Sequence, residues 1–450
     1  MRKIVLALIS IIIATADAGA QQPVKLSLDD CIAYALRNNN AVKNAHLDML
    51  IQEAKVKQTT AAALPHINGK GDFSYSYIIP AQFIDASTFP SGGVTPPKGT
   101  IVPISFSLPY AASAAITTSQ LLFDGSVIVA LQARNTIVEM AKQSEQITAE
   151  NVRYNVYKAY NSLVIAYKQY EIIKTSLTLA RSMEGDLVKT RNAGFAEKID
   201  VDRTSVQINN LATDSMKVSN MLVVAEQVLK YNLGMDINTP IVLTDTSVEK
   251  SWQSNATLIA EKENYERVPE YAVLQTALKL NEFDLKRYKL SAIPSVSGFW
   301  AYGDNYGHTR FNNLFNTDWY APSSVLGVSI NAPIFNGFAR QHQVREARLN
   351  IEKTKNNIDN LKKSIDFQAS TSRTTLKNSM LQVQSQKRNL ELSNSVLDLA
   401  QKKYKAGVGS NLEVTTAQTD LLRAQNNYFM ALLDVINAEA DLKKALGLLK

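Results

Sequence analysis

The chain has 450 residues, of which 45% are hydrophobic and 20% charged, and its formal net charge is +7 at pH 7. Acidic residues are interleaved with the basic ones, as in Lys142 and Glu145, so this charge is typical of solvated helix faces and excludes a dedicated nucleic-acid-binding surface. The single cysteine and the four scattered histidines do not have the spacing of metal ligands, so we predict no metal site. Gly-x-Ser-x-Gly, Walker and GxGxxG patterns are absent, so we predict no cofactor and no enzymatic activity.

The first 20 residues are predicted to be a cleaved secretory signal peptide. Arg2 and Lys3 form its charged start, residues 4–13 its apolar run, and residues 18–20 a small-residue cleavage site. After it, no run of 18 or more apolar residues occurs, so we expect no membrane-spanning helix. An exported chain that crosses a membrane without such a helix must do so as a closed β-barrel.

Short motifs occur twice in the chain, about 213 residues apart. Leu122-Phe123-Asp124-Gly125 returns as Ile334-Phe335-Asn336-Gly337, and Ala193-Gly194 returns as Ala406-Gly407. Repeats this long indicate a duplicated half-domain and not a solenoid. The predicted segments are a first structural repeat over 21–234, a polar linker over 235–262 that forms a belt between the halves, and a second structural repeat over 263–450.

Four segments alternate apolar and small polar residues with the two-residue period of a β-strand. They are predicted over about 66–79, 104–121, 295–308 and 323–335. Such segments fit the strands of an outer-membrane barrel, whose aromatic residues form girdles at the membrane interfaces. The alternative is a soluble sandwich, but four strands would be few beside so much helix. The predicted interface aromatics are Phe73, Tyr75, Tyr77, Phe106, Tyr110, Trp300, Tyr302 and Tyr306.

Two very long helices are predicted, because proline is absent between Gly125 and Gly194 and between Gly337 and Gly407. Each would be about 100 Å long at 1.5 Å per residue. Apolar residues recur along the first at alternating steps of four and three, which indicates a coiled-coil seam. Gly194 and Gly407 would form the left-handed turns where each helix reverses. The predicted helices are the long ones over 125–190 and 337–405 and the return helices over 198–233 and 411–447.

Four strands cannot close a barrel, and their unpaired edges cannot be left in lipid. The chain must therefore oligomerise as a ring. Two chains would give eight strands around a filled bore, whereas three would give twelve strands and an open lumen.

Over residues 26–448 the chain resembles the TolC-type outer-membrane efflux proteins. The resemblance depends on the duplication, the Phe-Asp-Gly and Phe-Asn-Gly motifs before the long helices, and the turn Tyr404-Lys405-Ala406-Gly407 followed by Leu412-Glu413-Val414. It implies an α+β membrane protein in which each chain contributes four strands to a trimeric twelve-stranded barrel, continued by an α-helical coiled-coil periplasmic tunnel. It also implies a homotrimer in outer-membrane lipid, a periplasmic adaptor (membrane fusion) protein, an inner-membrane RND or ABC transporter, and passive export in tripartite efflux or type I secretion.

In this family a periplasmic iris is held closed by polar links near the helix turns, and acidic rings line the constriction. The resemblance places Tyr404 at the linking tyrosine and Glu413 at the first acidic ring. The linking arginine falls on Gly409, and the second acidic position on Thr416. One acidic ring is therefore expected, without the family's arginine link.

The first repeat offers Arg191 or Asp200 as a substitute for that link. For Glu413 and Asp200 the alternative is ordinary helix-start chemistry, because acids are favourable near a helix N-terminus. The turns at Gly194, Gly407 and Gly409 are the expected adaptor-docking tips.

Two other functions compete with an export channel. A periplasmic coiled-coil adaptor or scaffold would lack the membrane barrel and its aromatic strands, and a secreted hydrolase would need a nucleophile and a base. The transported substrate, whether drugs, metals or proteins, cannot be assigned from the sequence.

Overall fold

The computed structural model describes residues 24–88, 97–245, 255–315 and 320–449. The predicted signal peptide, part of the segment between the first two predicted strands and part of the linker lie outside them. Two compact units are present. The sheet unit comprises Ile51–Val138 and Leu278–Lys353, and the helical unit comprises the described residues up to Leu50, Glu139–Ala277 and those from Thr354 onward. The long helices begin in the sheet unit and end in the helical unit.

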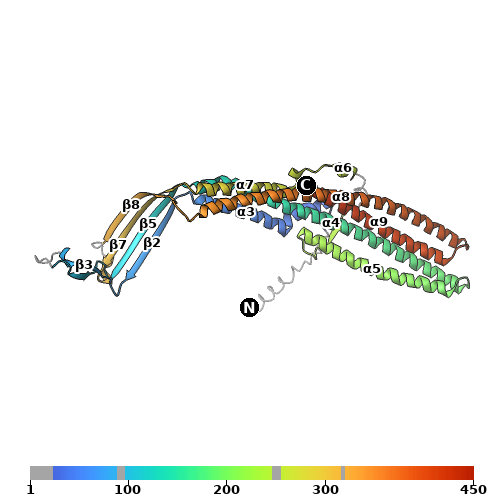
Figure 1. Ribbon diagram of the computed structural model, residues 1–450. Helices are drawn as coiled ribbons and strands as arrows, with labels where there is room; N and C mark the ends of the chain where they lie inside the picture. The colour runs from blue at the N-terminus through green and yellow to red at the C-terminus, as the bar shows by residue number, and fades with distance from the viewer. Residues whose placement is uncertain (1–23, 89–96, 246–254, 316–319, 450) are drawn as a thin grey trace, which may run out of the picture. The chain divides into compact units, whose positions relative to one another are not determined.

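The described elements follow the duplicated order expected from the sequence (Figure 1). In the first repeat they are β1 (Val24–Leu26), α2 (Leu28–Asn38), α3 (Asn40–Ala61), β2 (His66–Tyr75), β3 (Gln82–Asp85), β4 (Ile101–Ile104), β5 (Tyr110–Phe123), α4 (Gly125–Asn192), α5 (Lys198–Leu233) and β6 (Ile241–Leu243). They continue with α6 (Asn255–Ala260), α7 (Pro269–Leu290), β7 (Ser295–His308), β8 (Tyr320–Asn331), α8 (Ala339–Lys405) and α9 (Asn411–Ala445).

The sheet unit contains one antiparallel sheet in the order β2-β5-β7-β8 (Figure 1). Each half of the chain contributes one adjacent pair of strands, and β5 and β7 join the two halves from Tyr110 opposite His308 to Phe123 opposite Val296. Within the described residues, β2 and β8 pair on one side only. The sheet therefore has two open edges.

Three predicted strand limits differ from the structure by four residues or more, and proline explains two of them. The strand expected to begin at residue 104 begins at Tyr110, directly after Pro109. Residues Ile101–Ile104 instead form β4, which pairs with β3 in a hairpin that we did not predict. The strand expected to reach residue 335 ends at Asn331, two residues before Pro333. Proline lacks the N–H that a central strand must donate. The first strand, expected to reach residue 79, ends at Tyr75.

The two long helices begin differently, although the motifs before them are alike. Asp124 Oδ1 accepts hydrogen bonds from the N–H groups of Ser126 (2.7 Å) and Val127 (3.1 Å), and α4 starts at Gly125. In the second repeat Gly337 and Phe338 both have positive φ, 63° and 67°, so α8 starts only at Ala339. A left-handed residue cannot continue a right-handed helix.

The helical unit packs α4 with α5 and α8 with α9 around one extended apolar core (Figure 1). The predicted coiled-coil seams supply it: Val156 and Leu163 from α4, and Ala369, Leu376 and Val383 from α8, are buried. Among the described residues, no helix is both long enough and apolar enough to pass through a bilayer.

Both return helices end at a glycine that packs against backbone. Gly234 has φ 70°, and a Cβ there would lie 2.8 Å from the carbonyl oxygen of Asn38. Gly447, 213 residues later, has φ 66°, and a Cβ there would lie 2.5 Å from the carbonyl oxygen of Arg267. The duplication is therefore preserved in three dimensions.

Candidate functional site

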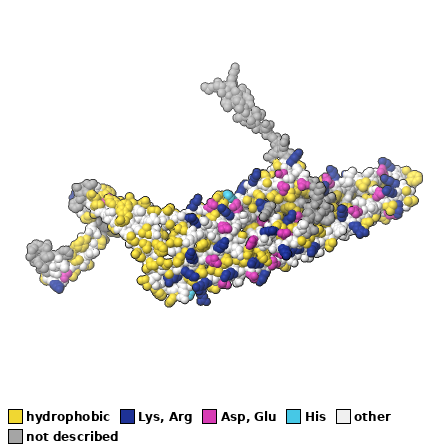
Figure 2. Space-filling model, turned by 90° about the horizontal axis from the view of Figure 1, so that it is seen from above, with side chains coloured by type: hydrophobic (Ala, Val, Ile, Leu, Met, Phe, Trp, Pro, Cys, Tyr) yellow, Lys and Arg dark blue, Asp and Glu magenta, His cyan; other side chains and the backbone are white. Residues whose placement is uncertain are grey.

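The register of the sheet gives it one apolar face. Residues paired across an antiparallel sheet point to the same side, and those two apart along a strand share that side. Leu326, Trp300, Thr118 and Ile67 form one row across the four strands. A second row further along the same face is Tyr320, Tyr306, Ala112 and Phe73. Figure 2 shows hydrophobic side chains gathered over the part that carries the strands and charged side chains dispersed over the helices.

Apart from Phe299, Val325 and Leu121, the opposite face of the same sheet is small and polar. One of its rows is Ala321, Asn305, Ser113 and Asp72, and the next is Ser323, Gly303, Ala115 and Lys70. The Nζ atom of Lys70 lies 2.8 Å from Oδ2 of Asp72. The sheet thus has the two contrasting faces of a wall between lipid and water.

Six of the eight predicted interface aromatics lie on the apolar face. Their rings meet in pairs, with centroids 4.6 Å apart for Tyr75 and Tyr110 and 6.5 Å apart for Trp300 and Tyr302. Tyr77 and Phe106 are exposed beyond the ends of β2 and β5, so for them the predicted position in a strand was wrong. The six on the face are Phe73, Tyr75, Tyr110, Trp300, Tyr302 and Tyr306.

The apolar face has about the height of a bilayer core. Ten residues of β7 separate Val296, next to the helices, from Tyr306, which is about 33 Å of strand at 3.3 Å per residue. At the strand tilt of about 40° typical of such proteins, this corresponds to about 25 Å along the membrane normal.

At the far end of the helical unit, both helix reversals use the same turn. Gly194 and Gly407 have φ of 83° and 76°. In the first turn the N–H of Phe195 donates to the carbonyl of Thr190 at 3.0 Å, and in the second the N–H of Val408 donates to that of Lys403 at 3.1 Å. These bonds satisfy carbonyls that a helix end leaves free.

Gly409 has a different role from these two turn glycines. A Cβ at this position would lie 2.9 Å from Cβ of Lys403 and 3.0 Å from the backbone nitrogen of Tyr404. The glycine therefore allows the chain to pass close to the end of α8 before α9 begins.

A buried polar contact connects the starts of α5 and α9. Asn411 Nδ2 lies 3.4 Å from both the carbonyl oxygen of Asp200 and the hydroxyl of Thr204, which itself donates to the Asp200 carbonyl at 2.9 Å. Asn411 is only 4% exposed and Thr204 only 2%. The Oδ1 atom of Asn411 is buried and has no hydrogen-bond partner among the described residues. Neither residue was predicted from the sequence; their positions in the first two turns of the two return helices were the available signal.

Tyr404 lies beside this contact. It packs on the small apolar cluster of Leu397, Ala400 and Val414. Burial, and then the negative charges of Asp200 and Asp186, raise the pKa of the Tyr404 phenol. Of the four predicted gate residues, Tyr404 and Asp200 are therefore near enough for the charge of one to act on the other.

The other two predicted gate residues are exposed. Arg191 lies in the last turn of α4. Glu413 lies in the first turn of α9, where its backbone N–H donates to Oγ of Ser410 at 3.2 Å. Glu413 also lines a shallow groove with Lys403 and Asp420. The helix-start chemistry considered as the alternative for Glu413 is therefore present.

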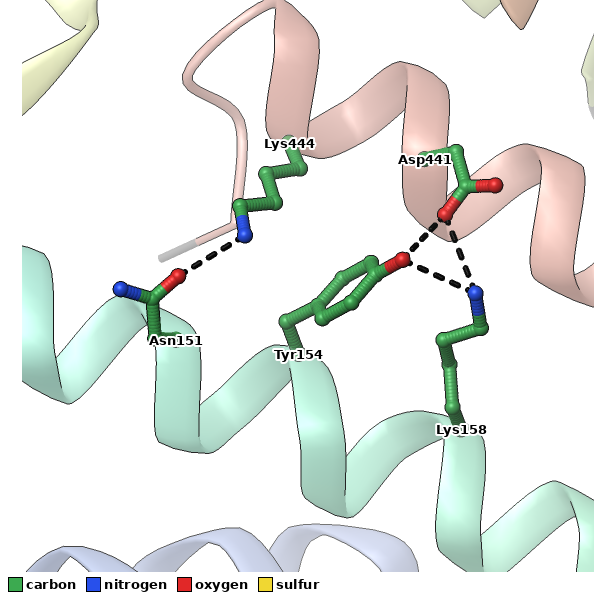
Figure 3. A network of polar contacts seen from close by, with 5 residues as sticks. All are labelled: Asn151, Tyr154, Lys158, Asp441 and Lys444. Carbon is green, nitrogen blue, oxygen red and sulfur yellow. Dashed lines mark hydrogen bonds and ion pairs between the residues drawn. The ribbon is translucent and has the colours of Figure 1, made fainter.

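A second polar network joins α4 to α9 nearer the middle of the long helix (Figure 3). The Tyr154 hydroxyl donates to Oδ1 of Asp441 at 2.5 Å and accepts from Nζ of Lys158 at 2.8 Å, while Lys158 Nζ also lies 3.2 Å from Asp441. Lys444 lies 4.5 Å above the Tyr154 ring and donates to Oδ1 of Asn151 at 2.8 Å. Burial and the Asp441 bond raise the pKa of Tyr154. The network fixes the end of α9 against α4.

Residues 301–448 match the family model described as outer membrane efflux protein. This segment therefore carries an outer membrane efflux protein domain, and the chain as a whole has the TolC-type fold. The chain has the fold of CusC, whose published description refers to transmembrane channel formation (TM-score 0.72, 19% identity, 93% of this chain and 91% of CusC). It also has the fold of the CmeC outer membrane channel of Campylobacter jejuni (TM-score 0.72, 16% identity, 93% and 85%). The helical tunnel of this fold and its position in the outer membrane match what we expected from the sequence.

The relatives that the chain matches in sequence are distant. Protein CyaE of Bordetella pertussis is 22% identical over 70% of this chain and 66% of its own length. The probable efflux pump outer membrane protein TtgC of Pseudomonas putida is 22% identical over 94% of this chain and 83% of its own length. The matched family is one of channels and not of enzymes.

Proposed function

We propose that three copies of this chain form one conduit through the outer membrane, with a twelve-stranded barrel built from their sheets and a periplasmic tunnel built from their helical hairpins. The observation that carries the proposal is the four-stranded sheet with open edges at β2 and β8. Unpaired edges are costly in lipid, and pairing β8 of one copy with β2 of the next removes them. Twelve strands leave an open lumen.

The two faces of the sheet indicate which side of the proposed barrel contacts lipid and which side lines the lumen. The face with Ile67, Trp300 and Leu326 is directed to lipid, and the face with Asp72, Ser113 and Asn305 is directed to the lumen. A lumen of this chemistry selects little, so the conduit is passive and the choice of cargo belongs to its partners.

The partners proposed are a periplasmic adaptor and an inner-membrane RND or ABC transporter. Exposed apolar side chains next to the two turns, Phe195 and Val408, support adaptor docking at Gly194, Gly407 and Gly409. Among the relatives, ArpC of Pseudomonas putida is named an antibiotic efflux pump outer membrane protein. We assign this chain to the export of small toxic molecules or of proteins and name no single cargo. Residues around the linker 235–262 are assigned to a belt around the tunnel.

The gate is proposed at the tips of the helical unit. Asn411 holds the start of α9 against the Asp200 carbonyl, and Tyr404 packs the end of α8 on Val414, which closes the hairpins on one another. Glu413 and its copies from the other two chains form an acidic ring at the constriction, and Arg191 is the candidate for a link between hairpins.

The experiment is to purify the chain from outer-membrane fractions and determine its mass by native mass spectrometry, its gel mobility without boiling and its conductance in planar bilayers. A heat-sensitive trimer with discrete conductance steps is the expected result. A monomer that stays in aqueous solution without detergent and does not conduct would contradict the proposal and favour a periplasmic scaffold.

A further inference from the structure

The sheet unit contains an apolar groove of about 310 Å³ beside the strands. Its walls come from the end of α3, the start of α4 and the end of α7. A groove of this size, mostly apolar with a few polar groups, is typical of a small-molecule site. The apolar side chains that line it are Val56, Val129, Ala130, Leu131, Ala133, Ile137, Leu280 and Phe283.

Two guanidinium groups stand at this groove. Arg134 comes from α4 and is exposed, and Arg287 comes from α7. Arg287 is positioned by Asp284, 3.1 Å away, and by the Tyr288 ring, whose centroid lies 4.6 Å from its Cζ atom. With Asp284 also on the wall, the lining has a net positive charge. Apolar walls with cations beside them fit an anionic amphiphile.

The ends of these three helices, together with the start of α8, carry almost all of the excess charge of the chain. Eleven Lys or Arg and five Asp or Glu lie on the parts of α3, α4, α7 and α8 that belong to the sheet unit, a formal net charge of +6. The whole chain has +7, so all its other residues together contribute +1. Clustered basic residues next to a membrane attract anionic headgroups.

The groove lies directly next to the apolar band of the sheet. Thr60 is six residues before β2, Val129 is six residues after β5, and Arg287 is eight residues before β7. Six helical residues extend about 9 Å. The start of α4 is also tight against the end of α7, since a Cβ on Gly125 would lie 2.9 Å from the carbonyl oxygen of Leu290. With the sheet in the bilayer, the groove is at headgroup depth.

We propose that this groove binds an anionic glycerophospholipid of the leaflet that faces the periplasm, with one acyl chain against Val129 and Phe283 and the phosphate between Arg134 and Arg287. The proposal rests on the membrane position of the sheet in the proposed function. The bound lipid fills the space between the three helix ends and neutralises part of their charge.

The test uses the full-length protein reconstituted in nanodiscs containing phosphatidylglycerol and phosphatidylethanolamine in equal amounts, then released into detergent for native mass spectrometry. The wild type should retain phosphatidylglycerol in preference to phosphatidylethanolamine. Arg134→Gln with Arg287→Gln should reduce that preference by about fivefold per arginine. Ala130→Leu should reduce retention of both lipids, because it fills the groove and leaves the arginines in place.

Arg423→Gln is the matched control, because Arg423 is also an exposed arginine paired with an aspartate three residues earlier, Asp420. It should leave lipid retention unchanged. Equal phosphatidylglycerol retention by the double variant and the wild type would overturn the proposal. A double variant that loses the trimer but keeps the wild-type lipid ratio would also overturn it, because a second copy of the chain would then cover the groove. Release of the lipid by inorganic phosphate alone would overturn it as well.

Planar-bilayer conductance of the same samples separates this proposal from the proposed function. A wild type that conducts as a trimer but shows no lipid preference would refute the lipid site and leave the channel intact. A wild type that does not insert or conduct would refute the channel itself.

Discussion

The Nζ atom of Lys443 lies 2.6 Å from Oε1 of Glu439, one turn earlier on α9, and only 6% of the Glu439 side chain is exposed. The first repeat has the equivalent pair 213 residues earlier, with Lys230 Nζ 2.7 Å from Oε1 of Glu226. There the lysine is the buried member, at 6% exposure, and it also donates to the carbonyl of Ile237 at 2.9 Å. The duplicated halves have therefore kept the ion pair and exchanged the charge that is buried.

Lys443→Met is expected to lower the free energy of unfolding by about 1–3 kcal/mol, because it removes a cation from a buried carboxylate. Circular dichroism during thermal unfolding in fixed detergent measures the change. Lys402→Met is the control, since Lys402 forms the same i,i+4 pair with Asp398 but both side chains are more than half exposed. Its cost should be below about 1 kcal/mol. Equal losses in the two variants would contradict a role for burial.

The architecture followed from sequence because it depends on period and repetition. Steps of four and three along α4 predicted the buried seam, and the two-residue alternation predicted the faces of β2, β5, β7 and β8. Strand ends were less accurate, since Pro109 and Pro333 end hydrogen bonding at positions where the alternation continues. The left-handed Phe338 was not foreseeable, because the matching position in the first repeat is the helical Ser126.

The candidate gate was only partly predictable. Family resemblance selected Tyr404, and the first-turn acid Asp200 was a guess that the structure places beside it. Asn411 and Thr204 were missed because their contact joins residues 207 apart through a small polar pair that has no sequence period. The basic helix ends next to the sheet were missed because they come from four separate segments, and the net charge of each segment alone is small.

Glu150 is expected to make the stability of the chain depend on pH. Burial, and then the charge of Glu270, raise the pKa of Glu150 to about 7, against the smaller opposing effects of Lys444 and Arg153. An acid whose pKa is raised on folding favours the folded state in its protonated form. The stabilisation is therefore complete below about pH 4.5 and is lost as the pH rises towards and through 7.

Glu150→Gln should consequently raise the apparent Tm at pH 8 and change it little at pH 5. Glu171→Gln, an exposed glutamate on the same helix, should change it little at either pH. Thermal scans at the two pH values give the comparison. A Glu150→Gln shift of the same size at both would show that the carboxyl group does not titrate in this range.

Asn411→Ala is expected to loosen the hairpin tips, because it removes the donor to Asp200 and Thr204 and leaves no group in its place. A net worth of about 0.5–1.5 kcal/mol for the lost hydrogen bonding corresponds to an increase of about two- to tenfold in the open-to-closed ratio. Single-channel recording in planar bilayers measures that ratio. Asn389→Ala, at an exposed asparagine on α8, provides the control. If both variants gate like the wild type, Asn411 is a packing residue and not part of the gate.

Glu413→Gln is expected to lower cation selectivity while leaving the trimer and its conductance steps in place. Three carboxylates around a narrow bore favour cations and repel anions, and the amide removes the charge at almost constant volume. The Ser410 cap is kept, since it accepts from the backbone N–H of residue 413 and not from its side chain. Reversal potentials across a salt gradient should move toward zero in this variant. They should stay at the wild-type value in Asp202→Asn, which changes an exposed acid in the second turn of α5. An unchanged reversal potential in Glu413→Gln would remove this carboxylate from the constriction and leave it with the helix-start role alone.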